Sequence, residues 1–336
     1  MKDNQRSAFK NLKKSLGQDD KLEQLVLDFA IRKTTGSRED LNGVFYSKNG
    51  RHVIMASKSL SGKYDVCEGT REIDADAFWG CAYLTEISLP EGIESIGHEA
   101  FGRCISLKKI TIPRSVARLG SNPFIGNTEL EVSSLSPNVT TDGKAVFTNG
   151  GKTLVSFISQ DAEYTVPEGV ETIAEKAFSK NKFIKNIQLP NSLRIIDDEA
   201  FFDCDALAAV KIPAGVTNIG VCAFADCEAL RSVEMCGIPE VIKRSMLSGC
   251  DDIRTISIPN HSTKHFSKLA ADYEDRIVER TGNSTAKTAD KETAPETTKE
   301  KTKHTDKKNA KHSDKENTES KDKQTTNKKR KSPMYK

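Results

Sequence analysis

A motif of 23 residues recurs along most of the chain, and this period limits the fold more than any other feature. The clearest copies begin at Leu84, Leu107, Ile184 and Leu207; the first reads LTEISLPEGIESIGHEAFGRC and the last LAAVKIPAGVTNIGVCAFADC. A unit of this length cannot bury its own apolar face, so successive units must stack on one another. We therefore expect a solenoid in which each repeat forms one turn.

Each copy opens with a short segment that has the apolar pattern of a strand. In the first copy Leu84 is followed by Ile87 and Leu89, and the last two show the alternation of a half-buried strand. A Pro ends most of these segments, because it has no amide hydrogen to donate to a neighbouring strand. These prolines are Pro90, Pro113, Pro190, Pro213 and Pro259.

Two further slots follow in every repeat. An aromatic slot holds Phe78, Phe101, Phe124, Phe178, Phe201 and Phe224, and Leu247 closes the series. Three residues later stand Cys81, Cys104, Asn127, Asn181, Cys204, Cys227 and Cys250. We expect both slots to point into the coil, where the Cys or Asn meets backbone groups that the turn leaves unpaired. Five of the eight cysteines are thereby explained as buried thiols.

A longer repeat divides the array into two parts. Residues 43–78 match residues 145–178, with Tyr64 and Phe78 lying 100 positions before Tyr164 and Phe178. Each copy begins with two short apolar runs around an Asn/Gly turn, which predicts an inserted β-hairpin. The expected domains are thus two hairpin-led modules, 43–142 and 143–260.

The ends of such an array need caps. Residues 1–42 and 261–280 each contain apolar residues at helical spacing, such as Leu22, Leu25, Val26 and Phe29. We expect a helical cap at each end, although these segments could instead be independent partner-binding helices. With the caps, the expected fold is an α/β repeat protein.

Residues 281–336 differ from the rest in composition. They hold 16 of the chain's 51 Lys and Arg but only nine of its 48 Asp and Glu, and Met334 and Tyr335 are their only larger apolar residues. Such a segment cannot bury enough apolar surface to offset the entropy lost on folding, so a disordered tail is expected. Its densest basic run is Lys328, Lys329, Arg330 and Lys331.

The repeat resembles the BspA-like, or Treponema pallidum type, leucine-rich repeat family, whose units read much like C-xx-L-xx-I-x-I-P-xx-V-xx-I-G-xx-A-F. Residues 77–104 and 222–236 carry the resemblance, and it covers about 43–260. The resemblance implies a curved solenoid with short strands on its concave side. It also implies a surface protein that attaches to other proteins or cells.

The start of the chain favours a different location. Its first ten residues, MKDNQRSAFK, lead into more charge without the apolar core of a signal peptide, and no apolar stretch is long enough to span a membrane. We expect a cytoplasmic protein. The alternative is the cell surface or secretion by a non-classical route, as the resemblance implies.

The outward residues of the strand segments are the candidate partner-binding face. They are small, polar and mixed in charge, and lack the aromatic anchors of tight interfaces, so a merely solvated surface is an equal alternative. These residues are Glu86, Ser88, Lys109, Thr111, Asn186, Gln188, Lys211, Ser232, Glu234, Thr255 and Ser257. The only tryptophan, Trp79, is either an exposed contact residue or packed against the first hairpin.

No residue pattern points to catalysis, a metal or a cofactor. We expect the six histidines to lie in loops, the C-terminal cap or the tail, and no partner carboxylate or Ser accompanies them at a recurring spacing. The nearest approach to a metal motif is Cys222 with Cys227, and Cys227 already belongs to the buried slot. The chain is therefore not expected to be an enzyme.

Two functions fit these features. The first is a protein-interaction module that binds another protein through the solenoid, with the tail as a spacer. The second is a nucleic-acid or anionic-surface binder that acts through the basic tail.

Overall fold

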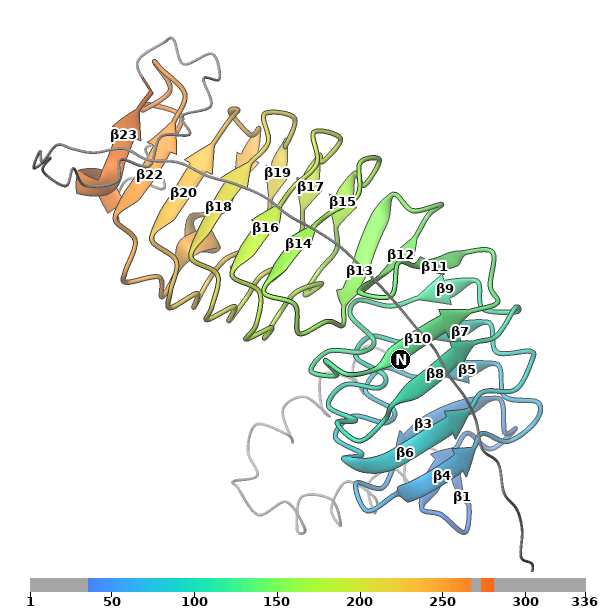
Figure 1. The fold of residues 1–336 in the computed structure, drawn as a ribbon. Coiled ribbons are helices and arrows are strands. Elements are labelled where there is room, and N and C mark those ends of the chain that lie inside the picture. The colour runs from blue at the N-terminus through green and yellow to red at the C-terminus, as the bar shows by residue number, and fades with distance from the viewer. Residues whose placement is uncertain (1–35, 267–272, 281–336) are drawn as a thin grey trace, which may run out of the picture. The chain divides into compact units, whose positions relative to one another are not determined.

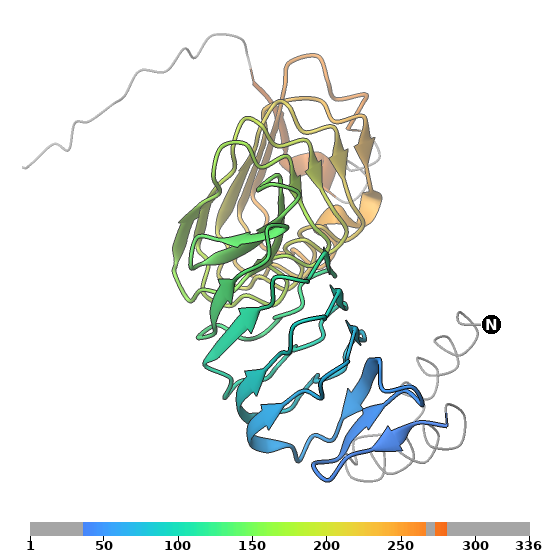
Figure 2. The same ribbon diagram turned by 90° about the vertical axis from the view of Figure 1, so that its right-hand side faces the viewer.

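The computed structural model of the chain describes residues 36–266 and 273–280. They form a β-solenoid whose turns stack one on another (Figures 1 and 2). Each complete turn contributes one strand to a ladder of longer strands and one to a ladder of shorter strands. The repeat period predicted this coil.

The longer strands pair in parallel and follow the predicted strand segments. The ladder comprises a pair, β4–β6, a second pair, β8–β10, and a six-stranded sheet from β14 to β23. The bounds are β4 Ser61–Asp65, β6 Tyr83–Ser88, β8 Lys109–Ile112, β10 Glu131–Ser134, β14 Glu163–Thr165, β16 Asn186–Gln188, β18 Ala209–Ile212, β20 Ser232–Met235, β22 Thr255–Ile258 and β23 Ile277–Glu279.

The shorter strands form two sheets, one in each half of the array, ordered β1-β2-β3-β5-β7-β9 and β11-β12-β13-β15-β17-β19-β21. The bounds in the first sheet are β1 Arg38–Glu39, β2 Val44–Tyr46, β3 His52–Ala56, β5 Glu72–Ile73, β7 Ser95–Ile96 and β9 Arg118–Leu119. Those in the second are β11 Val139–Thr141, β12 Ala145–Thr148, β13 Thr153–Phe157, β15 Thr172–Ile173, β17 Ile195–Ile196, β19 Asn218–Ile219 and β21 Val241–Ile242.

Both predicted hairpins are present, as the antiparallel pairs β2–β3 and β12–β13. In the second hairpin the turn residues Asn149, Gly150 and Gly151 have φ of 54°, 66° and 87°, and in the first hairpin Gly50 has a φ of 71°. Asn and Gly tolerate this left-handed backbone conformation best, which explains their place in these turns.

An aspartate ties each hairpin to the longer strand that follows. The hydroxyl of Tyr64 donates to Asp40 at 2.7 Å, and that of Tyr164 donates to Asp142 at 2.6 Å. The other carboxylate oxygen of each aspartate accepts two backbone amides of its own turn. The longer repeat of the sequence therefore reproduces the same set of hydrogen bonds, from a Tyr hydroxyl and two backbone amides to one aspartate.

The interior is a column of phenylalanines with a polar ladder beside it. Phe178, Phe201 and Phe224 stack at ring-centroid distances of 4.7 and 4.9 Å and are almost fully buried. The thiol of Cys227 donates to the carbonyl of Phe201 at 3.2 Å, and the amide of Asn127 donates to a Phe carbonyl of the preceding turn at 2.6 Å. This confirms the inward direction of both slots and the thiol state of the ladder cysteines.

The helical caps are not supported, and the α/β description is wrong for the described residues. Of the predicted C-terminal cap helix, 261–280, the described residues 273–280 contain a single α-helical residue, Tyr273, followed by the 3-10 helix η2, Glu274–Arg276, and strand β23, while residues 267–272 lie outside the described part. The last strand of a ladder has unpaired amides and carbonyls, and the β-branched pair Ile277–Val278 meets them with better geometry than a helix would. A second 3-10 helix among the described residues is η1, Arg244–Leu247.

The N-terminal cap falls mostly outside the described residues. Residues 1–35, with the apolar positions that suggested a helix, are not described. Residues 36–42 contain strand β1, which pairs antiparallel with β2. The predicted tail, 281–336, with its basic run, also lies outside the described part of the chain.

A polar junction joins the two halves of the array. The ammonium of Lys176 lies 2.7 Å from the carboxylate of Glu99, and the side chain of Asn122 donates to the carbonyl of Lys176 at 2.6 Å. Asn122 also accepts a hydrogen bond from Ser156. Burial favours the neutral amine, yet Glu99 raises the pKa of Lys176 overall. The junction therefore holds a charged pair where hairpin β12–β13 meets the first half.

Candidate functional site

The predicted partner-binding residues all lie on the longer strands with their side chains exposed or half-exposed. We call the outward side chains of β4, β6, β8, β10, β14, β16, β18, β20, β22 and β23 the strand face. Parallel pairing in register places Asn186 beside Ala209 and Lys211 beside Glu234. The face is continuous within each sheet, as the sequence pattern predicted.

The charges of the strand face are paired with one another. Lys63 lies 3.0 Å from Glu86, Lys109 lies 3.0 Å from Glu131, and Lys211 lies 3.1 Å from Glu234. The hydrogen bond and charge of Glu86 raise the pKa of Lys63. Exposed ion pairs contribute little to stability, but a partner must compete with them for each charge.

Several uncharged groups of this face also bond to one another or to its charged groups. Thr111 and Ser133 share a hydrogen bond of 2.9 Å, and the amide of Asn186 donates to Glu163 at 3.0 Å. A surface whose polar groups satisfy one another offers few free donors or acceptors. The strand face is therefore less suited to strong polar recognition than its sequence suggested.

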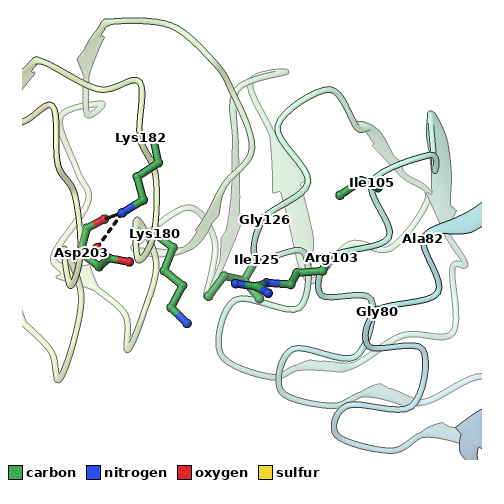
Figure 3. Close-up of a pocket in the computed structure, with 9 residues that line it drawn as sticks. All are labelled: Gly80, Ala82, Arg103, Ile105, Ile125, Gly126, Lys180, Lys182 and Asp203. Atoms are coloured by element: carbon green, nitrogen blue, oxygen red, sulfur yellow. Dashed lines mark hydrogen bonds and ion pairs between the residues drawn. The ribbon is translucent and has the colours of Figure 1, made fainter. Parts of the chain in front are cut away.

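A cleft at the junction of the two halves has a different character. We call it the junction cleft; it has a volume of about 490 Å³ and is lined by Gly80, Ala82, Arg103, Ile105, Ile125, Gly126, Lys180, Lys182 and Asp203. Arg103 and Ile125 reach from one wall and Lys180 from the other (Figure 3). The turns after the phenylalanine slot build both walls.

The cations of the junction cleft are not equally engaged. Lys182 lies 2.6 Å from Asp203 and 2.7 Å from Asp205. Within the part of the chain that the structure describes, neither Arg103 nor Lys180 forms an ion pair with a carboxylate. Beside them Ile105 is 64% exposed, an unusually large fraction for an aliphatic side chain. The cleft thus combines free positive charge with exposed apolar surface.

Trp79 packs against Arg103, one of the residues that line the cleft. Its ring packs so closely over Gly102 that a Cβ there would lie 2.1 Å from it. The guanidinium of Arg103 sits 5.7 Å from the ring centroid, in cation–π range. Trp79 is half-buried and packs on Gly102 of the next turn of the solenoid.

No pattern in the sequence predicted this cleft, because its residues occupy variable positions of five repeats. Trp79, Gly102 and Ile125 share one slot, while Arg103, Gly126 and Lys180 share the next. Only the stacking of turns makes neighbours of residues that lie 23 or more positions apart.

One group of side chains among the described residues could hold a metal ion, formed by His52, Glu72 and Asp74. The expectation that His52 lies in a loop is wrong, and sequence spacing did not reveal its two carboxylate neighbours. It lies in strand β3, where its Nδ1 is 3.2 Å from Asp74 Oδ1 and 3.3 Å from Glu72 Oε2. Parallel pairing of β3 with β5 brings these residues together.

The cysteines show no comparable arrangement in the described region. Cys227 directs its thiol to the carbonyl of Phe201, and Cys222 is a half-buried residue with a φ of 53° in the turn before the phenylalanine slot. No helix among the described residues is long and apolar enough to cross a membrane.

One of the similar solved structures supports the solenoid fold. A leucine-rich repeat protein from Eubacterium ventriosum is 22% identical with a TM-score of 0.50, over 62% of this chain and 66% of its own. A leucine-rich cell surface protein from Faecalibacterium prausnitzii is 24% identical with a TM-score of 0.49, over 62% of each chain. The pneumococcal vaccine antigen PcpA is 21% identical with a TM-score of 0.48, over 66% of each chain.

This chain thus spans less than two thirds of the length of those three proteins, and at such identities the likeness concerns the fold alone. No curated protein matches the sequence. The family of BspA type leucine-rich repeat regions matches residues 62–164 and 156–270, in 6 copies. Since that match covers more than half of the chain, the protein belongs to the BspA-type leucine-rich repeat family.

Proposed function

We propose that the solenoid is a non-enzymatic protein-binding module and that the junction cleft is its main contact. The observation that carries this proposal is the pair of cations, Arg103 and Lys180, beside the exposed side chain of Ile105. Leucine-rich repeats of this type support binding rather than chemistry, because each turn presents side chains on a rigid backbone.

The chemistry of the cleft selects a class of partner. A segment with carboxylates can neutralise Arg103 and Lys180, and an aliphatic or aromatic side chain beside them can cover Ile105. Charge-assisted hydrogen bonds to Arg are about twice as strong as neutral ones, and Arg is enriched among the residues that dominate interfaces. The strand face, whose charges are already paired, is the second candidate contact.

A peptide display library selected on the full-length protein tests both surfaces. The variant Arg103→Gln/Lys180→Gln changes the cleft, and Lys109→Gln/Lys211→Gln removes the same charge from the strand face. We expect the selected peptides to carry Asp or Glu near an apolar residue and to lose binding only to the cleft variant.

Three results would contradict the proposal. Selected peptides without carboxylates would show that Arg103 and Lys180 do not determine binding. Loss of binding only in the Lys109→Gln/Lys211→Gln variant would place the contact on the strand face. Peptides that bind both variants but also bind an isolated peptide of residues 281–336 would identify the basic tail as the binding element.

A further inference from the structure

A histidine and two carboxylates converge on the outer side of the shorter strands, away from the junction cleft. Nδ1 of His52 lies 3.3 Å from Oε2 of Glu72 and 3.2 Å from Oδ1 of Asp74, and the three ligand atoms lie within 4.8 Å of one another. We propose that these three side chains bind a divalent first-row transition ion of the Zn²⁺ type.

Two of the three distances between ligand atoms match those of a coordination sphere. Zn²⁺ binds imidazole nitrogen and carboxylate oxygen at about 2.0–2.2 Å, so two ligand atoms of a tetrahedral site lie about 3.3 Å apart. Both separations from Nδ1 agree with that value. The side chains of His52, Glu72 and Asp74 are 33%, 39% and 36% exposed, so a fourth position is open to water.

The donor set favours a transition ion over calcium or magnesium. Ca²⁺ takes six to eight oxygen ligands, and Mg²⁺ also prefers oxygen in octahedral geometry. One imidazole with two carboxylates suits Zn²⁺ and its neighbours in the first transition row.

The backbone holds the three side chains in place. His52 pairs with Glu72 in the parallel ladder between β3 and β5, and the amide of Asp74 donates to the carbonyl of Val53 at 3.0 Å. Residues two apart on a strand project to the same side, so Glu72 and Asp74 share the outer side while Ile73 points into the core. Ligands placed by regular strands are better preorganised than ligands on loops.

Hydrogen bonding alone accounts for only part of this arrangement. Nδ1 of His52 can carry a single hydrogen, yet two carboxylates lie within 3.3 Å of it. Arg118 lies 3.9 Å from Oε1 of Glu72, so Oε2 is the oxygen of this carboxylate that faces His52. A bound cation can contact Nδ1 and one oxygen of each carboxylate at the same time.

The second half of the array shows that the fold does not need the cluster. The positions equivalent to His52, Glu72 and Asp74 hold Thr153, Thr172 and Ala174. Thr153 pairs with Thr172 in the same way as His52 pairs with Glu72. The amide of Ala174 donates to the carbonyl of Leu154 at 2.9 Å, as that of Asp74 does to Val53. Two copies of one backbone thus carry a ligand set in the first half and inert side chains in the second.

This internal copy supplies matched variants for a test in the full-length protein. His52→Thr/Glu72→Thr/Asp74→Ala gives the first half the residues of the second. Thr153→His/Thr172→Glu/Ala174→Asp grafts the ligands onto the second half. Binding of ZnCl₂ is measured by calorimetry, and the melting temperature of each metal-free variant verifies folding.

We expect the first variant to lose one equivalent of bound Zn²⁺ and the graft to gain one. Zinc bound by histidines or thiols elsewhere contributes equally to all three proteins and cancels from these differences. CaCl₂ should give no difference among them. Equal zinc stoichiometry in folded wild type and first variant would overturn the proposal, as would a calcium difference as large as that for zinc.

Discussion

Truncation of Phe201 to alanine tests the stacked interior of the solenoid. Phe201 has no exposed surface and stacks on Phe178 at 4.7 Å and on Phe224 at 4.9 Å. Phe→Ala in a core costs about 3 to 5 kcal/mol, and each lost aromatic pair contributes about 0.5 to 1.5 kcal/mol. The neighbouring turns cannot close the cavity easily, because the amide of Phe201 donates to Ala223 at 2.7 Å in a fixed ladder. We therefore expect a loss in the upper part of that range, about 4 to 5 kcal/mol.

The loss is measured by urea unfolding followed by circular dichroism. With a slope near 3 kcal/mol/M, the midpoint should fall by about 1.5 M at an unchanged slope. Phe183→Ala is the control, because Phe183 is 38% exposed and its truncation should cost less than about 1 kcal/mol. If Phe201→Ala costs no more than this control, the assignment of inside and outside in the repeat is wrong.

Three further perturbations test the polar contacts and the thiols. Tyr164→Phe removes the hydrogen bond to Asp142 and should cost about 1 to 2 kcal/mol in urea unfolding, whereas a cost near zero would mean that water replaces it fully. Lys176→Met leaves Glu99 without its ammonium partner at 17% exposure and should cost about 1 to 2 kcal/mol; an unchanged stability would show that the junction does not depend on the pair. Burial raises the pKa of the Cys81 thiol from 9.0 to about 12, so it stays protonated in the fold while the unfolded chain ionises. Stability should therefore fall as the pH rises from about 9 towards 12, and Cys81→Ala should reduce that slope; identical slopes would refute the assignment.

The regular part of the fold was predictable because equivalent positions in all repeats lie in the same structural environment. The Phe and Cys/Asn slots recur at a fixed period, so their inward direction could be derived without knowing the neighbours of any one residue. The C-terminal cap was not predictable in the same way. The apolar spacing at Tyr273 and Ile277 fits a helix. Residues 277–279 instead form strand β23, because they pair with the edge of β22.

The strand face shows how far a pattern can describe a site. The sequence identified which residues point outward, and the structure agrees. It could not show that Lys109 is paired with Glu131 or Lys211 with Glu234, because such pairs depend on which side chains adjacent turns bring together.

The sequence by itself determined the solenoid, its hairpins and its buried column, because these follow from a period in which every unit repeats the same contacts. Only the tertiary structure decided the junction cleft and the cluster of His52, Glu72 and Asp74. Their members occupy variable positions, some of them 20 to 100 residues apart, and stacking of the turns alone makes them neighbours. Periodicity fixes what all repeats share, whereas a binding site arises where particular repeats differ.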